Sequence, residues 1–218
     1  MEPTAPLAKQ MLVSLLLSGG KLQEARPYVE RWLASEPENA GHVFMQIHSL
    51  LMRAPDKAAA LEWLVEVTKP YPKVAEAHWA VAQVATVANN KELALTEIHQ
   101  TVQLRPDWDM AVVFEAQLLL PNEPKKALEL LQKFLKANPA NKDVRLFYAR
   151  ALLEQKQYAE SRVQFQQLLE VNQESSELAF AVALLSLQMG ELDRAEKELQ
   201  ETLGKGKKDA GTVHYYLA

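Results

Sequence analysis

Histidine and carboxylate side chains are the groups in this sequence best suited to acid–base chemistry or metal binding. The five histidines are His42, His48, His78, His99 and His214. The closest pair, His42 and His48, is six residues apart, which on a helix puts the two rings on different faces rather than in one ligand set. Glu36 and Glu38 come at a predicted helix end, with no apolar pocket to raise a carboxyl pKa. We therefore expect no catalytic residues, no metal site and no cofactor, and we predict that the chain is not an enzyme.

Two further features bear on chemistry. Residues 204–208 (GKGKK) have the composition of a phosphate-binding loop, but the preceding strand and the full glycine and Ser/Thr spacing are lacking. A turn between two helices explains this stretch better. The chain has no cysteine, which excludes a disulfide scaffold, a zinc–thiolate site and a cysteine nucleophile. A cysteine-free chain tolerates either redox environment, so the compartment stays open.

Charge is distributed unevenly along the 218 residues, although the net charge is only −4. Residues 74–124 carry two basic and seven acidic side chains, whereas residues 125–150 carry seven basic and two acidic ones. A nucleic-acid-binding protein normally carries a basic footprint across the domain, which this chain lacks, so we predict no nucleic-acid partner. The contrast is either a bipolar surface that orients an acidic partner or pairs two copies, or a solvated face. The longest apolar runs fall far short of about 18 residues, which predicts no membrane span in this fragment.

The elements that position these residues follow a period of about 34 residues. Pro37, Pro72, Pro106 and Pro139 are 35, 34 and 33 residues apart, and each follows an apolar helical stretch. Twelve residues before each proline is an alanine, at positions 25, 60, 94 and 127. A second series with the same period runs through Ala82, Ala116, Ala149, Ala183 and Ala218. Two small-residue series with one period indicate a helical repeat array.

Each repeat is predicted to contain two helices. Apolar residues recur at three and four residues, as in Leu128, Leu131, Phe134 and Leu135. Short turns divide the units at residues 19–20, 54–56, 89–90, 121–124, 156–157 and 190–191. Helices of about 12 to 15 residues are not stable alone in water, so stability must come from stacking. The alanines let neighbouring helices approach closely enough to share one core.

The sequence patterns that carry a family resemblance are Leu178–Ala183 followed by Met189–Ala195, and Tyr148-Ala149 followed by Tyr158–Ser161. They resemble tetratricopeptide repeats, and the resemblance covers nearly the whole chain. It implies an all-α, right-handed solenoid of antiparallel helix pairs, forming a single domain over residues 1–218. The implied repeats are about 6–39, 40–74, 75–108, 109–141, 142–175 and 176–209, with the first helix of a seventh at 210–218. Val13 and His48 stand where the family has a small residue.

The resemblance implies a function as well: such arrays hold peptides or helices of partner proteins on the concave surface lined by the first helix of each repeat. An apolar row and a more polar row four residues further on are expected to face this groove. The predicted groove residues are Met45, Ser49, Trp79, Gln83, Val113, Gln117, Leu146, Arg150, Phe180, Leu184 and Tyr215. The competing interpretation is that the apolar row packs between repeats as core.

A subclass of the family clamps a terminal carboxylate with lysines and asparagines in these rows. Here Gln10, Ser14, Met45 and Ser49 occupy the relevant places, so we expect no such clamp. Residues 213–218 begin a helix that lacks its partner, which suggests a fragment of a longer array or a homodimer through an uncapped C-terminal helix.

We therefore predict a non-catalytic scaffold with a protein or peptide partner. The alternative is a regulatory or assembly array of a longer protein, possibly an enzyme, that self-associates through its ends. A more distant resemblance to bacterial repeat arrays leaves two compartments open: the chain is cytoplasmic, or periplasmic if the full-length protein has an export or lipid-anchor signal.

Overall fold

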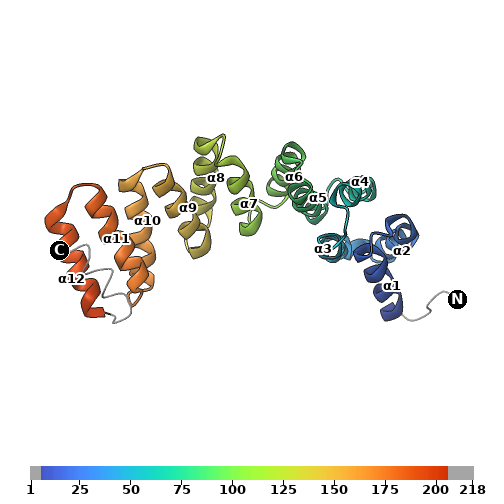
Figure 1. The fold of residues 1–218 in the computed structure, drawn as a ribbon, viewed down its shortest axis with the longest axis horizontal. Coiled ribbons are helices and arrows are strands. Elements are labelled where there is room, and N and C mark those ends of the chain that lie inside the picture. Colours follow the sequence, from blue (N-terminus) through green and yellow to red (C-terminus); the bar gives the residue numbers. More distant parts are fainter. Residues whose placement is uncertain (1–5, 206–218) are drawn as a thin grey trace. The chain divides into compact units, whose positions relative to one another are not determined.

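A computed structural model of the chain describes residues 6–205, and these form twelve α-helices and one short 3₁₀-helix (Figure 1). The predicted all-α fold class is confirmed. The helices are α1 (Pro6–Ser18), α2 (Leu22–Ser35), α3 (Ala40–Leu51), α4 (Lys57–Thr68), α5 (Ala75–Val87), α6 (Lys91–Leu104), α7 (Asp109–Leu119), α8 (Pro124–Ala137), α9 (Lys142–Glu154), α10 (Tyr158–Val171), α11 (Ser176–Gln188) and α12 (Leu192–Lys205). The 3₁₀-helix η1 (Pro37–Asn39) lies between α2 and α3.

The chain divides into two compact units. Unit 1 is Met1–Leu118 and holds α1 to α6 with all of α7 but its last residue, and unit 2 is Leu119–Ala218 and holds α8 to α12. The boundary falls inside the predicted fourth repeat, 109–141, a division that the helical period did not predict.

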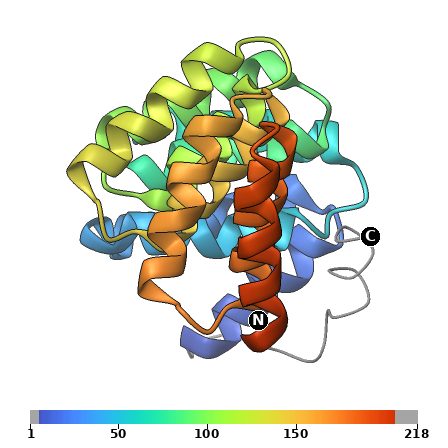
Figure 2. The same cartoon turned by 90° about the vertical axis from the view of Figure 1, so that its left-hand side faces the viewer.

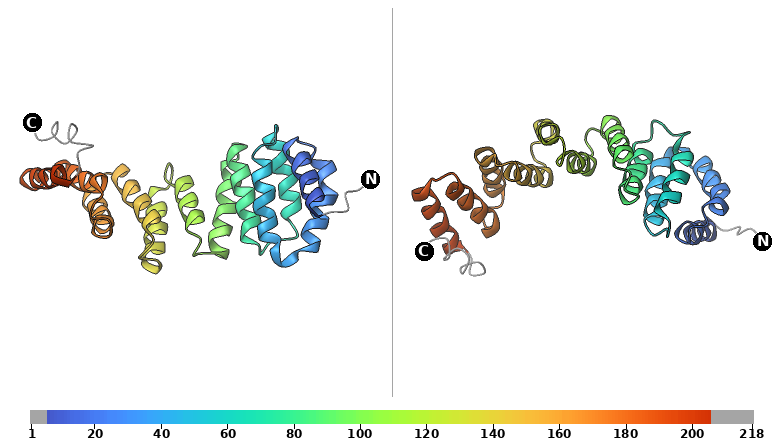
Figure 3. Two further views of the ribbon diagram at one scale, coloured as in Figure 1. Left: turned by 90° about the horizontal axis from the view of Figure 1, so that it is seen from below. Right: turned by 45° about the horizontal axis from the view of Figure 1, so that its top comes forward.

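Within the two units, four odd-numbered helices each pack on the even-numbered helix that follows, as the first and second helices of a repeat. In unit 1, α1 packs on α2 and α5 on α6, and α3 lies beside both α1 and α5 (Figure 3). In unit 2, α9 packs on α10 and α11 on α12, and Figure 2 shows α11 and α12 side by side. This arrangement is the paired geometry expected for a helical repeat.

Left-handed residues end the first helix of four repeats. Gly20 and Gly190 have φ of 75°, and Asn89 and Lys156 occupy the equivalent turns with φ of 60° and 58°. In each turn the next amide donates back to a carbonyl five residues earlier, as from Asn90 N to Ala85 O at 2.8 Å. This bond is the Schellman motif, which satisfies carbonyls at a helix end that would otherwise lack a donor. The turns predicted from residues 19–20, 89–90, 156–157 and 190–191 are therefore confirmed.

Side-chain caps begin several of the following helices. Asp56, Asn90, Asn141 and Ser175 each accept a hydrogen bond from the amide three residues on, at 2.9 to 3.3 Å. Such caps satisfy orphan amides of the first helical turn. The four periodic prolines all lie after a second helix, in the segments between α2 and α3, α4 and α5, α6 and α7, and α8 and α9. Their predicted role as helix-ending residues is confirmed.

The alanine series lie in the core of each unit. In unit 1, Ala25, Ala60 and Ala94 have no exposed surface and belong to one cluster of buried residues. In unit 2, Ala149 and Ala183 are equally buried. Ser161 replaces the alanine of α10 and is accommodated because its Oγ donates to the carbonyl of Ala149 at 2.7 Å. The small residues thus allow the close helix contacts that the sequence predicted.

The two departures from the small-residue pattern are both tolerated. Val13 is 2% exposed and lies in the core of unit 1. His48 is partly buried, its Nε2 has no hydrogen-bond partner among residues 6–205, and burial lowers its pKa. Burial thus favours the neutral form of the His48 ring.

Two sequence expectations concern residues beyond those described. The helix predicted at 210–218, with Tyr215, and the homodimer through it lie outside residues 6–205. Within residues 6–205, no helix is both long and apolar enough to cross a lipid bilayer.

Candidate partner-binding surface

The apolar row predicted for the groove is not uniformly exposed in unit 1. Met45 on α3 and Val113 on α7 are partly buried, whereas Trp79 on α5 is only 6% exposed. Met45 packs against the cluster formed by Trp79, Ala82, Ile98 and Ala111. Trp79 therefore lies between repeats, and Met45 and Val113 retain part of their surface for contact with another molecule.

An aromatic cluster explains the position of Trp79. Its ring stacks on Trp108 at a centroid distance of 4.8 Å and meets the edge of Phe114 at 5.6 Å. The guanidinium of Arg105 lies 4.7 Å from the Trp108 ring and forms a 2.5 Å ion pair with Glu76. Stacking, edge contacts and the cation–π contact each stabilise this junction between the third and fourth repeats.

The predicted polar row of unit 1 consists of Ser49, Gln83 and Gln117, which differ in whether their side chains are hydrogen-bonded within residues 6–205. Ser49 is exposed, but its Oγ donates to the carbonyl of Gln46 at 2.9 Å. Gln83 is partly buried and Gln117 is exposed, and neither side-chain amide has a hydrogen-bond partner among residues 6–205. These two glutamines stand at equivalent positions of consecutive first helices, 34 residues apart. Their donors and acceptors are thus available to a ligand.

The remaining predicted residues have mixed environments. In unit 2, Leu146 and Phe180 are partly buried against hydrophobic clusters, Leu184 is partly buried, and Arg150 is exposed. On α1 of unit 1, Gln10 is exposed and Ser14 is partly buried. The role of these side chains in partner binding stays a prediction.

Most side chains of the basic stretch are exposed in unit 2, where Lys125, Lys126, Lys133, Lys136, Lys142 and Arg150 face solvent. Arg145 is instead held within the unit, where it donates to the carbonyl of Pro139 at 2.7 Å and to Gln164 at 2.7 Å. Of the acidic residues of unit 1, Glu115 is buried rather than solvated.

The structure contains two histidine–carboxylate contacts that were not predicted from the sequence. Nδ1 of His78 lies 2.6 Å from Oε2 of Glu97, and Nε2 of His78 lies 3.1 Å from the carbonyl of Pro72. A carboxylate and a carbonyl both accept hydrogen bonds, so this arrangement favours the protonated ring, which donates from both nitrogens. The hydrogen bond to Glu97 raises the pKa of His78, against the opposing effect of burial. The contact ties α5 to α6.

The second contact joins α6 to α7, where Nδ1 of His99 lies 2.6 Å from Oε1 of the buried Glu115. The other oxygen of Glu115 has no partner in the described structure. These pairs are 19 and 16 residues apart, so no helical spacing within one element could have predicted them. Within residues 6–205, no three His, Asp or Glu side chains gather in a metal-binding group.

Comparison with known proteins identifies the repeat. Residues 118–185 match the family model described as tetratricopeptide repeat. No curated protein matches the chain. Among solved structures, YrrB, described as a TPR protein with an unusual peptide-binding site, has a TM-score of 0.62 and 15% identity, covering 85% of this chain and 97% of YrrB.

Two other solved structures are similar. A MamA protein has a TM-score of 0.63 and 15% identity over 80% of this chain and 96% of its own. A tetratricopeptide repeat protein from Parabacteroides merdae has a TM-score of 0.57 and 18% identity over 91% of this chain and 80% of its own. At these identities the likeness establishes a shared fold.

Proposed function

Because the chain is a tetratricopeptide repeat protein, we propose that it is a non-catalytic scaffold that binds a peptide or helix of a partner protein along its first helices. The observation that carries the proposal is that the side-chain amides of Gln83 and Gln117 in unit 1 have no hydrogen-bond partner within residues 6–205. Met45 and Val113, whose surfaces are partly open, supply apolar contacts in the neighbouring row.

The chemistry of this surface suits a neutral polypeptide segment. A primary amide both donates and accepts, so it can pair with the N–H and C=O of a peptide backbone whatever the ligand's side chains. Methionine and valine add apolar contact area, and methionine adapts to ligands of different shape. The peptide-binding site of YrrB, a protein of similar fold, supports a ligand of this kind.

The proposal can be tested with peptides selected by phage display on the immobilised chain. Their dissociation constants are then measured by calorimetry against Gln83→Ala, Gln117→Ala and the double variant. Each substitution removes one or two hydrogen bonds to the ligand, so we expect about three- to tenfold weaker binding per glutamine.

Gln100→Ala is the matched control, because Gln100 is an exposed glutamine on the second helix α6 of the same unit. Its affinity for the selected peptides is expected to equal that of the unmodified chain. If the selected peptides bind the double variant with unchanged affinity, the first helices of unit 1 are not the binding surface.

A further inference from the structure

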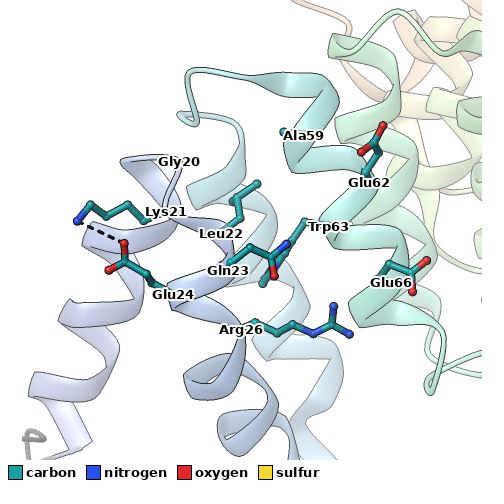
Figure 4. A pocket seen from close by; sticks show the side chains of 10 residues that line it. All are labelled: Gly20, Lys21, Leu22, Gln23, Glu24, Arg26, Ala59, Glu62, Trp63 and Glu66. Carbon is teal, nitrogen blue, oxygen red and sulfur yellow. Dashed lines mark ion pairs between the residues drawn. The ribbon is translucent and has the colours of Figure 1, made fainter.

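A groove with an apolar floor lies between the second helices α2 and α4 of unit 1 (Figure 4). Leu22, Ala59 and the largely buried Trp63 provide apolar lining, and polar side chains from residues 21–26 and from α4 surround it. Its volume is about 490 Å³, within the range of sites that take a small ligand or a large side chain. We call it the α2–α4 groove.

One charge in this lining has no ion-pair partner within the part of the chain that the structure describes. Four of the five charged side chains of the α2–α4 groove are engaged within unit 1, through the pairs Lys21–Glu24 (3.5 Å), Arg26–Glu30 (2.7 Å) and Lys69–Glu66 (2.5 Å). The remaining one is Glu62, whose exposed carboxylate has no ion pair or hydrogen bond within residues 6–205. Figure 4 shows Glu62 on the α4 side, and the Lys21–Glu24 pair lies at the opposite edge.

The corresponding groove of unit 2 shows that packing does not require this carboxylate. Residues of α8, α9 and α10 line it, and on α10 they hold the four repeat positions that line the α2–α4 groove on α4. Glu160, Val163, Gln164 and Gln167 stand in the places of Ala59, Glu62, Trp63 and Glu66. Val163 is 47% exposed, so an apolar side chain is tolerated there. The groove of unit 2 has its own carboxylate, Glu160, at the place of Ala59, so the α2–α4 groove differs in carrying the carboxylate one turn further along the helix, at Glu62.

We propose that the α2–α4 groove binds an arginine side chain of a partner protein. The methylene stem of arginine would cover Leu22, Ala59 and the edge of Trp63, and its guanidinium would pair with Glu62. The side chain of Gln23, which also lines the groove and has no partner within the described residues, supplies an acceptor for a further N–H. Arginine fits better than lysine because its planar group meets a carboxylate through two parallel hydrogen bonds. This site lies on the second helices, apart from the surface of the proposed function.

The test uses the full chain labelled with ¹⁵N and three synthetic peptides of one sequence, in which the central residue is arginine, norleucine or glutamate. The arginine peptide is expected to shift amide signals of residues 20–26 and 59–66. Norleucine keeps the apolar stem without the cation, so it is expected to bind several-fold more weakly, and the glutamate peptide is expected not to bind.

Variants of the chain separate the charge at the site from charge elsewhere. Glu62→Gln is expected to weaken the arginine peptide about fivefold, the upper end for an exposed ion pair. Glu92→Gln, which removes the same charge from an exposed position on α6, is expected to leave the affinity unchanged. Gln83→Ala/Gln117→Ala is expected to leave it unchanged as well, so failure here and failure of the proposed function can be distinguished.

Three results would overturn the inference. The first is a set of shifted signals elsewhere in the chain, the second is equal affinity for the arginine and norleucine peptides, and the third is an affinity that Glu62→Gln does not change.

Discussion

Trp79→Ala is the substitution that most directly separates a core role from a groove role. The Trp79 side chain is 6% exposed and loses its stacking on Trp108 and its edge contact with Phe114 when truncated. Truncation of a buried tryptophan costs about 3–5 kcal/mol in the free energy of unfolding. Because Trp108 is itself partly open to solvent, water can enter part of the space, and we expect about 3 kcal/mol.

The assay can follow unit 1 by itself, because all four tryptophans, at positions 32, 63, 79 and 108, belong to it. Urea unfolding followed by tryptophan fluorescence therefore reports unit 1, and circular dichroism reports both units. Trp79→Ala is expected to move the fluorescence midpoint to lower urea with an unchanged slope. Trp79→Phe, which keeps an aromatic ring in the cluster, is expected to cost about 1 kcal/mol. A loss below about 1 kcal/mol for Trp79→Ala would refute the packed position of this ring.

Three further predictions concern the packing, the turns and the charge of the array. Ala149→Leu overpacks a fully buried position and is expected to destabilise unit 2 by about 1–3 kcal/mol, measured by circular dichroism in urea. A Cβ added at Gly190 meets no described atom within 4 Å, but the residue must hold φ at 75°. Gly190→Ala is therefore expected to cost about 1–2 kcal/mol of backbone strain. Lys156→Gly, at an equivalent left-handed position, is expected to stabilise the chain. Because the pKa of His78 is raised above its ordinary value near 6.5, its bond to Glu97 stabilises unit 1 fully below that pH, and the gain is lost as pH rises through the raised pKa. His78→Gln is therefore expected to lower the fluorescence midpoint more at pH 5.5 than at pH 9.

The controls for these predictions come from the same elements. Ala159→Leu changes an exposed alanine of α10 and is expected to alter stability by less than about 0.5 kcal/mol. An equal effect of Ala149→Leu and Ala159→Leu would contradict the assignment of Ala149 to a close helix contact. An unchanged stability of Gly190→Ala would contradict its left-handed conformation. An equal effect of His78→Gln at both pH values would show that the His78–Glu97 bond contributes no pH-dependent stability.

The helix pairs, the turns between them and the alanine contacts could all be predicted from the sequence. Each depends on local properties that recur in every repeat: helical apolar spacing, a proline that ends the second helix, and glycine or asparagine where the backbone becomes left-handed. Gly20, Asn89 and Gly190 show the last property directly. Repetition made these weak local signals unambiguous, because one period had to fit all of them.

The functional surface was only partly predictable. Register placed Met45, Trp79 and Val113 in one row, but register does not determine exposure, which depends on what the neighbouring repeat places against each side chain. Trp79 is buried because Trp108, from the turn before α7, stacks on it.

The sequence by itself thus determined the repeat and its helix pairs, because their causes lie within a few residues of one another. Only the tertiary structure decided that His78 meets Glu97 and that Glu62, which has no partner within residues 6–205, lines a groove, because both depend on contacts between different helices.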